Sequence, residues 1–443
     1  MVYSLLITFT ERRFSFMKLL NYIRRSENSV AIILATSMMS LSYPYGFPLV
    51  SPLILLIVAL NFISKNINFR INTGFILFFI CVLFYMFGMS MNGGIIYGYN
   101  KTDITNIISF LLFWTILSNL RKENFPLMLD KFAKLTVFLS LIVSVISLYK
   151  FMKLINGVRL NQFFAPNLSY PNGSSLVVDY NMFSLGMFSG LVMSVYLISK
   201  AKNITHLIYY LTAFMTIFCS VIFAGSRRGW VIAISLLIFV ILMAFKYIFT
   251  HRFEKNVMHF LKLSFAMTFI SIFLFLNFIL FDINIDIKNS PQVEQLKYRF
   301  QTLQLDRVDD SFSNSRTVLW DYAVHLFGEY NLLQLIIGSG FSYIPDFGNT
   351  FSTGSEGYPH SPIHSALLYS GLFGALTILI FLVWVIYKSL KHRKLIKLYF
   401  PLLFLISLTI VSISANSLFS ITPFILIAIT IISIPDKQHI PSN

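Results

Sequence analysis

Charged residues are scarce in this 443-residue chain: Asp, Glu, Lys and Arg make up 12% of it, about half the share of a soluble globular domain. Cysteine is scarcer still, with two residues, so no disulfide framework is expected. So few charges beside 56% apolar residues exclude a cytosolic enzyme, and the high apolar share excludes a disordered chain. The mean hydropathy of +0.73 and the 47 Phe residues indicate a protein that lies mostly in lipid.

Acidic residues are few relative to basic ones, and the formal net charge is +16. In a soluble protein this excess would suggest a nucleic-acid partner. Here the Lys and Arg residues fall in short clusters between apolar runs, a pattern typical of orientation signals in a membrane protein. We therefore expect a lipid bilayer, and no nucleic acid, as the partner of this chain.

The apolar runs predict an all-α polytopic membrane protein with about twelve transmembrane helices, since each crossing needs roughly 20 apolar residues. Residues 1–29 are expected to be a cytoplasmic segment, 30–282 to hold nine helices, 364–434 three more, and 435–443 to be a cytoplasmic tail. The predicted spans centre on 30–43, 48–63, 73–92, 104–119, 127–150, 178–199, 205–223, 229–247, 260–282, 364–387, 398–416 and 418–434.

The distribution of positive charge predicts the orientation of these spans. Most of the 34 Lys and Arg residues fall in one alternate set of loops, which therefore faces the cytoplasm together with both termini. Two loops on the other side are too long to be turns: residues 151–177, and residues 283–363, which are expected to be partly helical around Ser315–Ile337. Loops of this length in a compact bundle are usually functional, so the outer face is expected to carry the site.

Arg227 and Arg228 stand in a very short outer turn, against the charge rule. They are either interfacial anchors beside Trp230 or phosphate ligands, because the guanidinium fork suits bidentate binding of phosphate. Phosphate binding is the favoured interpretation.

His360 and His364 lie on the outer side where the span 364–387 begins, and Pro362 between them suits a first helical turn. The two rings therefore need not share one helical face. A zinc pair lacks a clear third and fourth ligand, so no metal and no cofactor are expected. A general base or a hydrogen-bond donor at the membrane surface is the favoured role.

Further outer candidates are Arg159, Arg299 and Arg316, with Asp179 and Asn181 at the head of the span 178–199. An N-cap is the simpler role for the last two residues, and Arg316 could be a solvated helix residue. Together these side chains indicate an anion site that faces the outer leaflet.

Four short motifs lie on the outer side or at the span ends beside it: Ser226-Arg227, Ser315-Arg316-x3-Trp320, Ile337-Gly338-Ser339-Gly340-Phe341, and His360 followed by Gly371-Leu372-Phe373-Gly374. Together they resemble the conserved block of the bacterial O-antigen polymerase and O-antigen ligase superfamily. The resemblance assigns the family histidine to His360 and the family arginine to Arg227, and the segment with Arg159, Asp179 and Asn181 is similar to polymerase members.

The resemblance implies a glycosyltransferase of the bacterial inner membrane that acts at the periplasmic face on undecaprenyl-pyrophosphate-linked glycans. Arg227 and His360, which match the family residues, are expected to be catalytic. Arg228 is an addition to the family pattern. The residues expected to bind substrate are Arg159, Asp179, Asn181, Arg228, Arg299, Arg316 and His364. A polymerase of repeat units is favoured over a ligase that acts on lipid A-core, and a chain-length regulator and a repeat-unit flippase are expected partners. A transporter or flippase for an anionic lipid or solute is the alternative from another class.

Overall fold

The computed structural model describes residues 26–39, 41–42, 71, 73–117, 125–155, 173–177, 180–201, 204–250, 314–351, 357–391 and 417–421. All regular secondary structure in these ranges is helical. Five of the helices are long and apolar enough to cross a membrane. The protein is therefore a multi-pass membrane protein that is all-helical where it is described, as predicted. The total of about twelve spans stays a prediction.

The described helices follow the predicted spans. They are α2 (Ser26–Met39), α4 (Thr73–Met91), α5 (Gly98–Leu117), α6 (Phe125–Ile155), α7 (Tyr180–Ser199), α8 (Ile204–Phe223), α9 (Arg227–Thr250) and α15 (Pro362–Lys391). The predicted spans 48–63, 260–282 and 398–416 lie outside the described residues, and so does the span 418–434 beyond Ile421.

The segment 283–363 contains helices in its described part, where they were predicted, but the predicted stretch Ser315–Ile337 is divided in two. It holds α12 (Asn314–Gly328) and α13 (Leu332–Ile337), which are followed by the 3₁₀ turn η3 (Gly340–Ser342) and by α14 (Tyr343–Thr350). The division occurs because Asn331 caps α13: its side chain accepts from the backbone N–H of Gln334, and the Gln334 side chain accepts from the backbone N–H of Asn331.

The chain forms two compact units, which are described separately. Unit 1 comprises Met1–Ser37, Phe47–Leu135 and Ser313–Asn443, and unit 2 comprises Met38–Gly46 and Thr136–Phe312.

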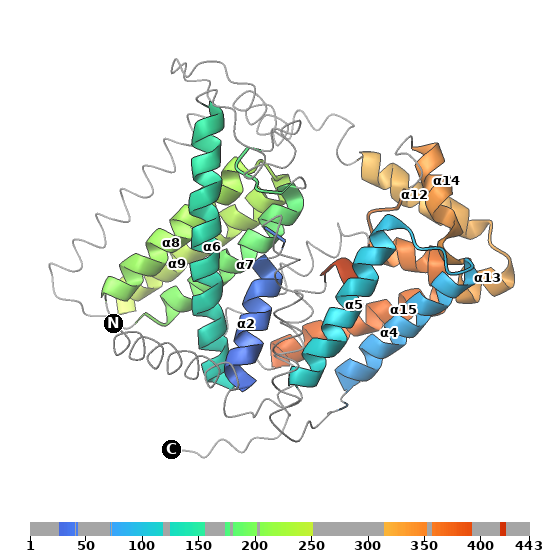
Figure 1. Cartoon of the computed structure of the whole chain (residues 1–443), viewed down its shortest axis with the longest axis horizontal. Helices are drawn as coiled ribbons and strands as arrows, with labels where there is room; N and C mark the ends of the chain where they lie inside the picture. Colours follow the sequence, from blue (N-terminus) through green and yellow to red (C-terminus); the bar gives the residue numbers. More distant parts are fainter. Residues whose placement is uncertain are drawn as a thin grey trace, which may run out of the picture. The chain divides into compact units, whose positions relative to one another are not determined.

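In unit 1, α4 packs along α15, and α5 packs against the 3₁₀ turn η5 (Leu418–Ile421) (Figure 1). Gly88 makes the first contact close, because a Cβ there would meet the backbone oxygen of Tyr369 at 2.8 Å. The core beside this contact is aromatic: the Tyr85 ring lies 5.3 Å from Phe341, 5.7 Å from Tyr369 and 5.0 Å from Phe419, each edge to face.

In unit 2, α7 lies against both α8 and α9 and is buried over most of its length (Figure 1). Small residues allow this burial. A Cβ on Gly190 would meet the Ser140 hydroxyl of α6 at 2.2 Å, and one on Gly186 would meet the Ser42 hydroxyl at 1.9 Å. Close packing through Gly and Ser is the usual basis of helix association in lipid, where burial of apolar surface contributes little.

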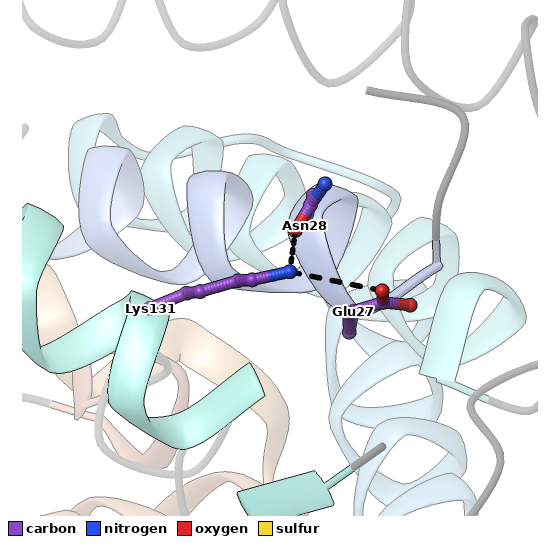
Figure 2. A network of polar contacts seen from close by, with 3 residues as sticks. All are labelled: Glu27, Asn28 and Lys131. Atoms are coloured by element: carbon purple, nitrogen blue, oxygen red, sulfur yellow. Dashed lines mark hydrogen bonds and ion pairs between the residues drawn. The ribbon is translucent and has the colours of Figure 1, made fainter. Parts of the chain in front are cut away.

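A polar contact joins α2 to the start of α6 within unit 1 (Figure 2). Lys131 Nζ lies 3.7 Å from Glu27 Oε1 and donates to Asn28 Oδ1. The Glu27 side chain is 8% exposed, so this ion pair is largely withdrawn from solvent. Removal of one partner from such a withdrawn pair would leave the other charge poorly compensated.

Candidate functional site

The N-terminus of α9 is fixed by a helix cap and by a side-chain hydrogen bond to α7. Gly225 has a φ of 74°, which reverses the chain after α8 at low cost. Ser226 is buried, and its Oγ accepts from the backbone N–H of Gly229 at 3.2 Å, so it caps α9. The same hydroxyl donates to Asn181 Oδ1 at 3.0 Å. Asn181, in the first turn of α7, therefore holds the start of α9.

Arg227 and Arg228 are the first two residues of α9. The first turn of a helix presents unpaired N–H groups and the positive end of the helix dipole. An arginine pair at this end therefore combines two sources of positive potential, which suits an anion such as phosphate.

Residues 173–177 are fastened to the same end of unit 2 by serine hydroxyls and backbone groups. The Ser147 hydroxyl donates to the Ser174 carbonyl at 2.7 Å and lies 2.9 Å from the Ser220 hydroxyl. The Ser174 backbone N–H donates to the Phe223 carbonyl at 3.0 Å. Gly173 contacts that carbonyl so closely that any Cβ there would lie 1.9 Å from it.

The buried Lys150, close to the C-terminal end of α6, is a residue that sequence reasoning did not single out. It is 4% exposed, and its Nζ donates to the Ser175 carbonyl. No carboxylate pairs with it in the part of unit 2 that the structure describes. In the sequence it is one basic residue near the end of an apolar run, and only the fold shows that it is buried against residues 173–177.

The predicted histidines lie in unit 1 and differ in setting. His364, in the first turn of α15, stacks on Trp320 of α12 with ring centroids 5.6 Å apart and planes at 8°. Its Nδ1 lies 2.8 Å from the Ser361 hydroxyl. The Nε1–H group of Trp320 is buried and has no partner among the described residues.

His360 precedes α15 and has a φ of 53°, the one positive φ of a non-glycine residue in the described ranges. Its ring meets that of Tyr358 edge to face at 4.6 Å. The left-handed conformation costs roughly 1–2 kcal/mol, and strained backbone of this kind clusters at active sites. The expectation that the two histidine rings need not share a helical face is therefore met: only His364 is helical, and Pro362 stands in the first turn as predicted.

The glycines after α13 form a backbone contact against α15. Gly338 has a φ of 85° and Gly371 a φ of 65°. A Cβ on Gly371 would lie 2.5 Å from the Gly338 nitrogen, and one on Gly340 would lie 2.8 Å from the Gly88 oxygen. Side chains are therefore excluded at these positions by both space and conformation.

Gly371 also breaks α15, since its ψ of −163° is not helical. The Leu368 carbonyl near this break accepts from the Ser339 backbone N–H at 3.0 Å and from the Tyr330 hydroxyl at 3.2 Å. Burial raises the pKa of Tyr330 to about 12, so this donor keeps its proton at neutral pH. The predicted span 364–387 is thus one run of sequence but two helical segments.

The remaining predicted site residues are placed only in part. Arg316 lies in the first turn of α12. Arg159, Asp179 and Arg299 lie outside the described residues. Within the described ranges, no group of three or more His, Cys, Asp or Glu could hold a metal ion.

Comparison with protein families matches residues 212–379 to the family described as O-antigen ligase. These residues form an O-antigen ligase family domain. The domain runs from within α8 to within α15, and its family comprises membrane glycosyltransferase-like ligases and polymerases. The resemblance of the motifs within these residues to the family is therefore confirmed. The predicted site residues inside the domain are Arg227, Arg228, Arg299, Arg316, His360 and His364.

Three predicted site residues precede the O-antigen ligase domain: Arg159, Asp179 and Asn181. The hydrogen bond from Ser226 nevertheless links Asn181 to the first turn of α9, inside the domain. A search among curated proteins found no match to this chain.

Proposed function

We propose that the protein is a polymerase that joins undecaprenyl-pyrophosphate-linked oligosaccharide repeat units by inverting glycosyl transfer. The observation that carries this proposal is the O-antigen ligase family domain at residues 212–379. It includes the arginine pair at a capped helix N-terminus and the two histidines at the start of α15. No cofactor and no metal takes part in the proposed reaction.

The proposed transfer is a single displacement at the anomeric carbon of the donor glycan. A hydroxyl oxygen of the acceptor sugar forms the new glycosidic bond, and the bond from the anomeric carbon to the pyrophosphate oxygen breaks. The electron pair leaves with the pyrophosphate. Arg227, with Arg228 or Arg159, binds this leaving group and stabilises the charge that grows on it. The capped first turn of α9 supports this role because its N–H groups favour an anion at the same end.

His360 is the proposed acceptor of the hydroxyl proton. Its strained backbone beside the N-terminus of α15 supports a functional role. His364, Arg299 and Arg316 are proposed to bind the sugars or the pyrophosphate. The stacking of His364 on Trp320 and its contact with Ser361 fix its ring, which suits a positioning role better than proton transfer. Asp179 and Asn181 are proposed to hold the substrate-binding segment before α7.

The proposed topology follows from the positive charges. About twelve helices cross the bacterial inner membrane, both termini are cytoplasmic, and residues 151–177 and 283–363 lie in the periplasm. On this proposal, 30–282 holds the first nine helices and 364–434 the last three. A chain-length regulator and a repeat-unit flippase are the proposed protein partners.

The transporter alternative is disfavoured by the composition of the spans. Helices α4 and α7 contain no Asp, Glu, Lys or Arg, and neither do the candidate spans Thr205–Phe223 and Pro362–Val385. Transporters of anions and ions carry such groups near the bilayer midplane. The charged residues of α6 all lie towards its two ends. This pattern favours chemistry at the membrane surface.

The proposed function is tested by deleting the gene in its own bacterium and by electrophoresis of the surface glycan. A polymerase deletion leaves a single repeat unit on lipid A-core. Long chains that accumulate on the undecaprenyl carrier would instead mark a ligase. An unchanged glycan would contradict both and favour the transporter.

Complementation of the deletion strain tests the residue roles. Arg227→Ala is expected to abolish polymer while the protein still inserts normally, as measured by immunoblot of membrane fractions. Arg227→Lys keeps the charge but loses the planar fork, and is expected to restore polymer only in part. Arg121→Ala, in a predicted cytoplasmic loop, is the matched control and should behave as wild type. Full-length polymer from Arg227→Ala would refute the pyrophosphate role.

A further inference from the structure

A cluster of buried polar side chains lies in unit 1. Ring contacts join the elements that carry it: α4 meets α5 through Phe78 and Phe110, and α4 meets η5 through Tyr85 and Phe419. Tyr85 of α4 and Asn100 of α5 are 0% exposed, and Asp103 of α5 and Ser417 before η5 are 2% exposed. Asn100 and Asp103 are three residues apart and so share one face of α5. Asp103 faces the side chains of both Tyr85 and Ser417. Three parts of the chain thus converge on one polar point inside an apolar unit.

Part of the hydrogen-bonding capacity of this cluster is unmet. The Asp103 carboxyl is hydrogen-bonded to the side chains of Tyr85 and Ser417, but both side-chain polar atoms of Asn100 and Oδ2 of Asp103 have no hydrogen-bond partner among the described residues. A single buried polar group without a partner costs on the order of 1–3 kcal/mol. Several such groups that converge on one point are uncommon in native proteins, and each calls for an explanation such as a bound water or ion.

Among the described residues, no basic side chain forms an ion pair with Asp103. Lys101 is the sole basic residue of α4 and α5, and it is exposed. The sequence 398–436 around Ser417 contains no Lys or Arg. The two lysines of α15, Lys388 and Lys391, lie at its C-terminal end, whereas Tyr369, which contacts Tyr85, lies near its N-terminal end. His364, in the first turn of α15, stacks on Trp320. A buried carboxylate in such surroundings requires a positive charge from elsewhere or a bound proton.

We propose that Tyr85, Asn100, Asp103 and Ser417 form a binding site for one sodium ion. The site offers the Asp103 carboxylate, the Asn100 amide oxygen and two hydroxyl oxygens. One carboxylate balances one positive charge, whereas a calcium ion takes six to eight oxygen ligands and a magnesium ion dehydrates reluctantly. A water in the same shell accepts from the Asn100 amide nitrogen, which meets the remaining capacity of that side chain.

The location gives the ion a structural role. The Tyr85 ring packs against Phe341 of the 3₁₀ turn η3 and against Phe419 of η5. Gly340 at the start of η3 rests on Gly88 of α4. Sodium therefore ties α4, α5 and η5 together directly beside the glycine turn that begins at Gly338. This proposal does not depend on the proposed glycosyl transfer.

The test measures sodium binding to the purified full-length protein in detergent. Thermal unfolding is followed while NaCl replaces choline chloride at constant ionic strength, and binding is measured with radioactive sodium. We expect a saturable rise in Tm with sodium, no comparable rise with magnesium at the same ionic strength, and one bound sodium per chain. Asp103→Asn should abolish both the sodium-dependent rise and the binding. Asp321→Asn, an exposed carboxylate of α12, should leave both unchanged.

Several outcomes would overturn the proposal. A wild-type Tm that does not respond to sodium, or wild-type protein that binds no radioactive sodium, would indicate a protonated Asp103 or a site filled by water. Sodium binding retained in Asp103→Asn would place the ion elsewhere. If Asp103→Asn does not fold, the wild-type titration decides, and Ser417→Ala, which removes one neutral ligand, should weaken sodium affinity without abolishing it.

Discussion

Ser226 supports the proposed pyrophosphate site without being expected to touch the substrate. Its hydroxyl accepts from the Gly229 backbone N–H at 3.2 Å and donates to Asn181 Oδ1 at 3.0 Å, and the residue is buried. Ser226→Ala removes both hydrogen bonds and leaves the helix geometry otherwise possible. The change therefore isolates the capping of α9 and its link to α7.

The cost of Ser226→Ala follows from these two contacts. Loss of an N-cap hydroxyl costs about 1 kcal/mol. Loss of the part-buried hydrogen bond to the Asn181 side chain adds about 1 kcal/mol. We therefore expect the free energy of unfolding to fall by about 2 kcal/mol, and polymer synthesis in cells to fall with it, because the first turn of α9 carries Arg227.

The assay is reversible unfolding of the purified protein by SDS titration, followed by circular dichroism. A double-mutant cycle with Asn181→Ala isolates the hydrogen bond between the two side chains, and its coupling energy should be about 1 kcal/mol. Ser235→Ala is the matched control, since that exposed serine of α9 bonds only to the Val231 carbonyl of its own helix in the described contacts. A coupling energy near zero, or a stability of Ser226→Ala equal to that of Ser235→Ala, would refute the capping bridge.

Three further predictions concern unit 1. Gly371→Ala should prevent accumulation of folded protein in membranes. The φ of 65° at Gly371 disfavours any side chain, and the new Cβ would lie 2.5 Å from the Gly338 nitrogen. Immunoblots of membrane fractions and size-exclusion profiles test this. Burial raises the pKa of Tyr330 to about 12 in the folded protein, above its unfolded pKa of about 10. The stability that Tyr330 contributes is therefore complete below pH 10 and is lost as the pH rises through about 12. In unfolding curves measured against pH, Tyr330→Phe should remove this part of the loss of stability at alkaline pH. Glu27→Gln should lower the unfolding free energy by about 1–3 kcal/mol, between the values for exposed and buried pairs, because Lys131 keeps its charge with a weaker partner; an equal stability of the variant and the wild type in the SDS titration would contradict this.

Helix positions and the family could be predicted because both depend on local patterns. Apolar runs in lipid are long and continuous, so the predicted span 205–223 and the helix Ile204–Phe223 nearly coincide. The motif at Ile337–Phe341 and the spacing from His360 to Gly371 sufficed to recognise the family that residues 212–379 match. These signals do not require knowledge of which helices touch.

Residues whose importance depends on packing could not be predicted in this way. Asp103 reads in sequence as the polar end of a span, and only the contact of α5 with η5 reveals that it is buried. Lys150 is one basic residue near the end of an apolar run, and only the fold shows that it is buried against residues 173–177. Ser226 was visible as part of a motif, yet its bond to Asn181 joins positions 45 residues apart. Long-range contacts of this kind leave no periodic pattern.

The break in α15 at Gly371 has a consequence for the construction of chimeras. Residues 362–370 belong to the helix by sequence, but the Leu368 carbonyl accepts hydrogen bonds from Ser339 and Tyr330 of the segment 283–363. A graft that exchanges this segment at Pro362 would cut through these bonds and would leave a half-helix without its partners. A chimera that exchanges the segment 283–363 between relatives should therefore have its junction at Gly371, nine residues after the start of the helix at Pro362.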